Sequence, residues 1–198
     1  MLIINTKALQ FACLLCAAVF SISCSAENRS VNEVEAAVSC LRDIPLEGES
    51  PEKWRKYFVC FPSSFDFFNS IFGSRGKSGS EVFGPLYQTS PEHILVRLPK
   101  TRTYVGDDAF IKKLVDLGVG ATWGADAPNH LRRLITQEMD KSPEAYLSYL
   151  SKKNRAEITN FWRFIYDSPT GVAPKNEYCV DAQSLAACQV LMDMLSQS

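Results

Sequence analysis

Apolar residues recur along this chain at the three- and four-residue spacing of amphipathic helices, in short stretches separated by Ser, Pro, Gly and Asp. After Ser30, for example, Val31, Val34, Val38 and Leu41 fall on one helical face. The same approach predicts further helices over residues 51–60, 64–73, 108–117, 127–139, 143–152, 155–167 and 182–196. The pattern therefore predicts a mainly α fold, organised as one compact multi-helix domain.

Helix starts are marked by recurrent capping chemistry. The tripeptide Ser-Pro-Glu occurs at residues 50–52, 90–92 and 142–144. In each copy Ser can cap, Pro suits the first helical position, and Glu complements the positive end of the helix. Ser30 and Glu33 have the spacing of a capping box. These signals predict where several of the helices begin.

Only a few segments depart from the helical pattern. Residues 82–87 and 94–98 carry strand signals, which Pro85 and Pro99 interrupt or end. Residues 73–80 contain three glycines and three serines and no apolar residue. This composition predicts an exposed, flexible loop within the domain.

The N-terminus has the layout of an export signal. A single charge, Lys7, precedes an apolar stretch over residues 8–22, and a polar, acidic chain follows. The apolar stretch is shorter than the roughly 20 residues that a membrane-spanning helix needs. We therefore interpret residues 1–23 as a signal peptide and residues 24–198 as a single exported domain.

The residues around Cys24 resemble the lipobox of bacterial lipoproteins, in which a small residue precedes a cysteine that is lipidated and becomes the new N-terminus. Ser23 and Cys24 fit that pattern. The resemblance implies a periplasmic, membrane-anchored lipoprotein, with a lipid on Cys24 as its only membrane contact. The alternative is ordinary cleavage after Ala26, which would release a soluble periplasmic protein.

Four cysteines follow Cys24, namely Cys40, Cys60, Cys179 and Cys188. An even number in an exported chain predicts two disulfides, and three pairings are possible. The preferred pairing is local, Cys40 with Cys60 and Cys179 with Cys188, because it closes the shortest loops. Residues 179 and 188 of one helix would lie about 13 Å apart, so Cys179 must precede the last helix. A rival pairing joins the first helix to the last.

Charge narrows the choice of partner. Without the signal peptide the chain has 20 basic and 22 acidic residues, a net charge of −2, which argues against nucleic-acid binding. Seven acids fall between residues 27 and 52. The hypothesis is that this segment binds a basic protein partner, and the candidate residues are Glu35, Asp43, Glu47 and Glu49. A solvated helix face is the simpler interpretation.

Aromatic residues are concentrated between residues 57 and 72, where seven occur in 16 positions. Phe65, Phe68 and Phe72 share one helical face. The simplest interpretation is that this segment packs against the aromatic residues 161–166 at the centre of the core. Alternatively, aromatic anchors such as Phe65 and Phe68 form part of a partner-binding surface.

Motifs of catalysis and metal binding are absent from the sequence. No H-E-x-x-H or G-x-S-x-G pattern occurs, no C-x-x-C pair lies beyond the predicted signal peptide, and the chain has only two histidines, His93 and His130. Asp107, Asp108 and Asp126 are conspicuous, but each occupies a position typical of a helix-capping acid. We therefore expect no catalytic residue, metal ion or cofactor, although an enzymatic role stays open.

The segment from Trp123–Asp126 to Phe161–Phe164, ending at residues 167–169, resembles small helical envelope proteins of bacteria that have no assigned activity. The resemblance implies location and fold, and no site. The leading hypothesis is a non-enzymatic binding protein of the bacterial envelope, in its most concrete form a periplasmic inhibitor or immunity protein that masks a toxic or lytic enzyme. The alternatives are a secretion or envelope-assembly accessory lipoprotein and a peptidoglycan-directed hydrolase.

Overall fold

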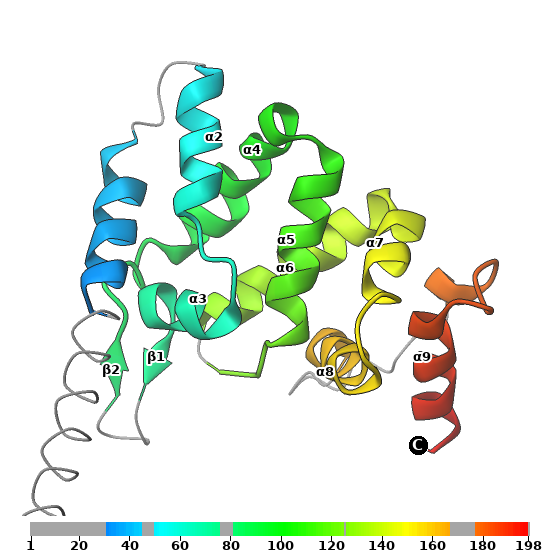
Figure 1. Cartoon of the computed structure of the whole chain (residues 1–198). Helices are drawn as coiled ribbons and strands as arrows, with labels where there is room; N and C mark the ends of the chain where they lie inside the picture. Colours follow the sequence, from blue (N-terminus) through cyan, green and yellow to red (C-terminus); the bar gives the residue numbers. More distant parts are fainter. Residues whose placement is uncertain (1–30, 45–49, 76–80, 125, 167–176, 198) are drawn as a thin grey trace, which may run out of the picture.

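Helices dominate the part of the chain that this computed structural model describes, which comprises residues 31–44, 50–75, 81–124, 126–166 and 177–197 (Figure 1). Residues 31–43 form the first helix. The labelled helices are α2 (Pro51–Cys60), α3 (Phe65–Phe72), α4 (Leu98–Val105), α5 (Asp107–Val119), α6 (Asp126–Lys141), α7 (Pro143–Leu150), α8 (Arg155–Tyr166) and α9 (Ala186–Ser196). All eight helices predicted from the sequence pattern are therefore confirmed, with bounds that differ by a few residues.

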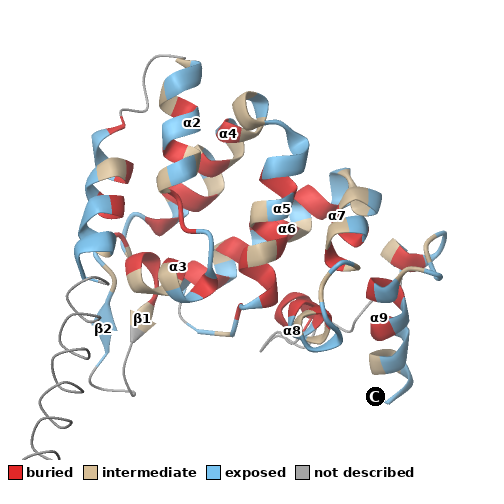
Figure 2. Ribbon diagram, viewed as in Figure 1, coloured by how far each residue is buried: buried red, intermediate tan, exposed pale blue. Residues whose placement is uncertain are grey.

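Helix α5 packs against α8, α7 and α4, and also contacts α3 and α6. Gly118 of α5 permits the close approach to α8, because a Cβ atom there would lie 2.7 Å from the ring of Phe161 in that helix. Figure 2 shows buried residues on the inward faces of the helices and exposed residues on their outward faces. The described residues form one compact, mainly α domain.

The prediction of a strand over residues 94–98 is wrong, because the chain is helical from residue 90 to residue 105. Glu92–Arg97 form a π-helical turn, in which the amide of Leu98 donates to the carbonyl of His93, five residues back. Pro99 then occupies the first turn of α4. A proline ring normally collides with the carbonyl four residues earlier. Leu95, four residues before Pro99, lies in the wider π-helical turn, and the chain stays helical across the proline.

The strand predicted over residues 82–87 is shorter than expected. β2 (Val82–Phe83) ends before Pro85, and the amide of Tyr87 then donates to the carbonyl of Gly84 in a turn. β2 pairs antiparallel with β1 (Ser74–Arg75). The loop predicted over residues 73–80 is therefore corrected at its start, where two residues form a strand. Residues 76–80 lie outside the described part of the chain.

The three Ser-Pro-Glu copies do not act alike. The hydroxyl of Ser50 accepts from the amide of Lys53 and caps α2 as predicted. Ser142 precedes α7 but makes no side-chain capping hydrogen bond, and Ser90 is itself helical. Ser30, the predicted cap of the first helix, lies outside the described residues. The same tripeptide thus takes different positions relative to the helix that follows it.

Both predicted disulfides have the local pairing, and this prediction is confirmed. Cys40 of the first helix bonds Cys60 at the end of α2. Cys179, in a short 3₁₀ turn (Glu177–Cys179), bonds Cys188 of α9. Cys179 precedes α9, as the geometry of a bridge required. Two disulfides favour an oxidising, extracytoplasmic compartment.

The predicted signal peptide, residues 1–23, lies outside the described residues, as do Cys24 and Ala26. Among the helices that the structure does describe, none combines the length and apolar character needed to cross a membrane. Lipidation at Cys24 and cleavage after Ala26 therefore both stay predictions.

Candidate functional site

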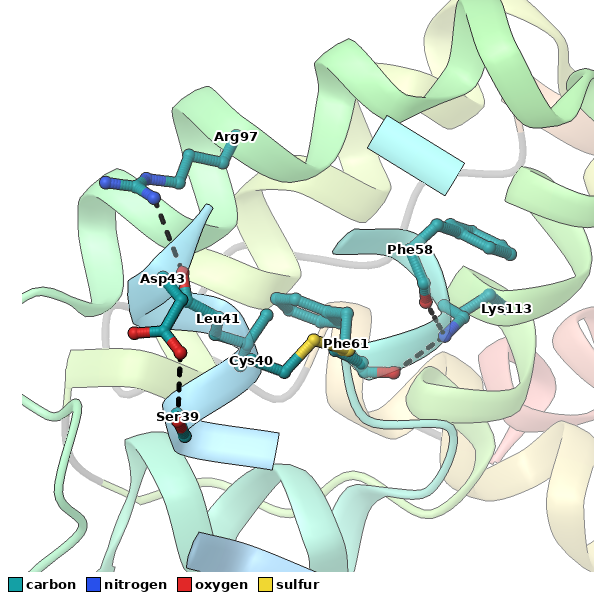
Figure 3. Close-up of a disulfide and its surroundings, with 9 residues drawn as sticks. Ser39, Cys40, Leu41, Asp43, Phe58, Phe61, Arg97 and Lys113 are labelled. Atoms are coloured by element: carbon teal, nitrogen blue, oxygen red, sulfur yellow. Dashed lines mark hydrogen bonds between the residues drawn. A yellow bond between two sulfur atoms is a disulfide. The ribbon is translucent and has the colours of Figure 1, made fainter. Parts of the chain in front are cut away.

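The structure describes only two of the four acidic residues that are predicted to bind a partner. Glu35 and Asp43 are exposed on the first helix, and Asp43 accepts a hydrogen bond from the hydroxyl of Ser39 at 3.0 Å (Figure 3). Glu47 and Glu49 lie outside the described residues. Only Glu35 and Asp43 can therefore be placed on a surface.

The aromatic candidates Phe65 and Phe68 belong to the core, which corrects the idea that they anchor a partner. Phe65 is 6% exposed and Phe68 is 0% exposed. Their rings lie 5.8 Å apart, and the ring of Phe65 also lies 6.3 Å from that of Phe164 in α8. The two aromatic segments thus pack together, which is the simpler of the two interpretations of the sequence.

A groove of about 830 Å³ lies between the start of the first helix and α3. We call it the acidic groove. Its lining residues are Val31, Glu33, Val34, Glu35, Ser63, Ser64, Asp66, Phe67, Ser70 and Pro85. This set contains three carboxylates and no cationic side chain. Apolar residues and three serines line the rest of the groove. The groove includes Glu35 of the predicted residues, whereas Asp43 lies two turns farther along the helix and is not in the lining.

The α3 wall of the groove follows from local sequence. The hydroxyl of Ser64 accepts from the amide of Phe67 at 3.4 Å and caps α3. Asp66 is therefore in the first helical turn, where a carboxylate is favoured by the positive end of the helix. Phe67 is on a different face from the buried Phe68, so its half-buried ring reaches the groove. Sequence reasoning missed Asp66 and Phe67 because the groove joins segments 30 residues apart.

The first helix is held in place at its far end. Cys40 is bonded to Cys60. Nη1 of Arg97 donates to the carbonyl of Ile44 at 2.8 Å. It also donates to the carbonyl of Leu41 at 3.4 Å, close to the disulfide (Figure 3). These bonds satisfy carbonyl groups that the end of a helix leaves without an intrahelical partner.

Lys113 of α5 secures the other side of the same disulfide. Its Nζ donates to the carbonyl of Phe58 at 2.6 Å and to that of Phe61 at 2.7 Å (Figure 3). Burial lowers the pKa of Lys113 to about 8, so the ammonium form still predominates at pH 7. The cation therefore caps the C-terminal end of α2, which carries Cys60. The first helix is thus fastened to α2 and to the helix that contains Arg97, and α2 is in turn fastened to α5.

The two histidines occupy separate places. His93 is 3% exposed, and its Nδ1 lies 2.8 Å from the hydroxyl oxygen of Tyr57. Burial, together with the nearby Arg97, lowers the pKa of His93 to about 4, so the ring is neutral at pH 7. His130 is half-buried in α6, and burial lowers its pKa as well. His93 is accounted for as a hydrogen-bonded core residue.

Ionisable side chains do not gather into a metal site in the described residues, where no group of three or more His, Cys, Asp and Glu is placed to hold an ion. Asp107 and Asp108 are in the first turn of α5, and Asp126 begins α6. Asp107 accepts from Nε of Arg102 at 2.7 Å, and Asp126 accepts from the hydroxyl of Tyr87 at 3.1 Å. These carboxylates are thus at helix starts, in agreement with the structural interpretation.

Comparison with known proteins adds no relative. No protein-family model, no curated protein and no solved structure matches this chain. The resemblance to bacterial envelope proteins therefore stays a prediction.

Proposed function

We propose that this chain is an exported, non-enzymatic protein that binds a basic segment of another protein of the bacterial envelope. In its most concrete form it is a periplasmic inhibitor or immunity protein that masks a toxic or lytic enzyme. A lipid on Cys24 would hold it at the membrane. The observation that carries the proposal is the acidic groove, whose lining among the described residues has three carboxylates, an apolar wall and no cationic side chain.

Basic side chains can contact both the apolar wall and the carboxylates of this groove. Lys and Arg have long apolar stems that can cover Val31, Val34 and Phe67, while their charged heads meet carboxylates. Val31 is 51% exposed, so covering it removes apolar surface from water. The carboxylates would mainly speed the encounter with a basic partner, and the apolar contacts would mainly slow its release.

The fastening of the first helix supports a binding role. The Cys40–Cys60 bridge and the bonds from Arg97 to the carbonyls of Leu41 and Ile44 restrain the helix that carries Glu35. A wall that is already in position does not have to be ordered when the partner arrives. Binding to a preorganised groove therefore costs less conformational entropy than binding to a mobile segment.

The test neutralises the groove and measures association. The double variant Glu35→Gln/Asp66→Asn removes two of the three lining carboxylates and spares Glu33, which supports the predicted start of the first helix. The probe is an amphipathic peptide of alternating paired leucines and lysines. At about 20 mM salt, we expect the variant to bind it roughly tenfold more slowly than the original protein, and at about 300 mM salt the difference should largely vanish because charges are screened.

A matched control separates the groove from net charge. Asp108→Asn/Glu144→Gln makes the same change in net charge, and both residues are exposed acids in the first turn of a helix, in α5 and α7. This control should bind the peptide as the original protein does. If both double variants slow association equally, the acidic groove is not the binding surface and the proposal fails. If only the groove variant slows association, cross-linking in envelope preparations, with that variant as the reference, identifies the natural partner.

A further inference from the structure

A second hollow, of about 640 Å³, adjoins the acidic groove. Pro85 lines both. Arg42 of the first helix is on one side of the second hollow, and the chain from Phe83 to Arg97 supplies the rest of its lining. We call it the cationic pocket, because its charged lining residues are Arg42, Arg97 and Glu92. Its volume is in the range of pockets that hold small organic ligands.

The charge of the pocket is concentrated on Arg42. Arg97 and Glu92 form an ion pair, in which Nε of Arg97 donates to Oε1 of Glu92 at 2.7 Å, so their charges offset each other. Arg42 is exposed, and its Nη2 donates to the carbonyl of Pro85 at 2.9 Å. Within the described residues, Arg42 makes this one side-chain hydrogen bond. A guanidinium group has five N–H donors, so most of them can still serve a ligand.

An aromatic wall accompanies this charge. The rings of Phe83 and Tyr87 lie 4.4 Å apart, and Phe83 is 50% exposed. The hydroxyl of Tyr87 donates to Asp126, which restrains the ring. This aromatic surface lines the same pocket as Arg42, and it is the surface that a flat apolar group would cover.

We infer that the cationic pocket binds a carboxylate group attached to a flat apolar body. The guanidinium group of Arg42 matches a carboxylate in planar, paired hydrogen bonds, and the apolar body lies against Phe83 and Tyr87. Two sources carry this chemistry, a free aromatic acid and the C-terminal residue of a protein chain. Glu35 and Arg42 are seven residues apart, two turns and about 10 Å along one side of the helix. A chain end could therefore reach the pocket from the acidic groove.

The experiment uses two matched pairs of probes and amide spectra of the isotope-labelled protein. Phenylacetate is compared with phenylacetamide, and acetyl-dialanyl-phenylalanine with its C-terminal amide. We expect shifts of the amides of residues 83–93 with the carboxylates, and roughly tenfold weaker binding of the neutral amides. Arg42→Gln should weaken carboxylate binding about tenfold, as expected for the loss of a charged hydrogen bond.

Arg55→Gln is the control, because Arg55 is also an exposed arginine that donates to one main-chain carbonyl, that of Tyr104, at 3.1 Å. It should leave carboxylate binding unchanged. Preference for phenylacetate identifies a free acid as the ligand, and preference for the peptide identifies a chain end. Equal binding of acids and amides, no shift with either acid, or no effect of Arg42→Gln overturns the inference. The Glu35→Gln/Asp66→Asn variant should still bind phenylacetate, so this result is independent of the proposed function.

Discussion

The hydroxyl oxygen of Tyr57 lies 2.8 Å from Nδ1 of His93, and both side chains are buried in the core. The same hydroxyl donates to the main-chain carbonyl of His93 at 3.2 Å. The ring of Phe72 lies 5.6 Å from the imidazole. Neutral polar groups that are hydrogen-bonded can be buried at little cost, whereas a buried imidazolium close to Arg97 would be unfavourable. Burial of this side chain therefore depends on a neutral His93.

This dependence predicts a loss of stability in mild acid. The pKa of His93 is about 4 in the folded protein and about 6.5 in an unfolded chain, so the unfolded state takes up a proton first. The stabilisation is complete above pH 6.5 and is lost as the pH falls towards 4, by about 3 kcal/mol in total. Urea unfolding at about pH 7 and about pH 4.5 measures this loss of stability.

His93→Gln is the reference for that measurement, because Gln is polar and does not titrate. The original protein should lose about 2 kcal/mol more than this variant between the two pH values. Carboxylate titration affects both proteins alike and cancels. Parallel losses in the two proteins would show that His93 is not the group responsible.

The two disulfides should differ in their effect on the acidic groove. Each closes a short loop, with sequence separations of 20 and 9 residues, and removing either should cost about 3 kcal/mol, slightly more for the longer loop. Cys40→Ser/Cys60→Ser also frees the first helix from α2 and should weaken binding of the basic peptide. Cys179→Ser/Cys188→Ser should leave that binding unchanged. Equal peptide binding by both variants would argue against a role of the bridge in holding the groove.

Glu138 should contribute far more to the free energy of unfolding than Asp107, which pairs with the same arginine. Glu138 is 4% exposed and accepts from Nη1 of Arg102 at 2.5 Å and from Nζ of Lys141 at 2.6 Å. Glu138→Ala leaves Arg102 without its buried partner and should lower the free energy of unfolding by about 3 kcal/mol. Asp107 also pairs with Arg102 but its side chain is 67% exposed, so Asp107→Ala should have a clearly smaller effect. Denaturant titration of both variants decides the order.

Anchoring is tested by Cys24→Ala. If Cys24 carries the lipid, this change should move the protein from the membrane fraction to the soluble periplasmic fraction, because a lipoprotein's several acyl chains hold firmly where one chain does not. Fractionation with an antibody to the protein measures this. A mature N-terminus at Glu27, found by mass spectrometry, would instead show cleavage after Ala26.

Much of the helical order could be predicted because its causes are local. Residues 51–60 were predicted with the bounds that α2 has, since Ser50 and Pro51 mark the start within the same few residues. The disulfide pairing was also predictable, because a bridge between Cys179 and Cys188 closes a short loop once Cys179 precedes the helix. The prediction failed at residues 94–98, where a π-helical turn accommodates Pro99 inside a continuous helix. Spacing rules written for regular helices do not include that turn.

The sequence by itself determined which residues share a helical face, but the tertiary structure decided which faces are covered. Periodicity placed Phe65 and Phe68 together, and only packing against α8 showed that they are buried while Phe67 reaches the surface. The acidic groove and the cationic pocket likewise need segments around residues 31–42, 63–70 and 83–97 to meet. Helix starts depend on contacts within one turn, which a sequence displays directly. A groove depends on the burial of helix faces far apart in the chain, and their relative placement is set by the whole core.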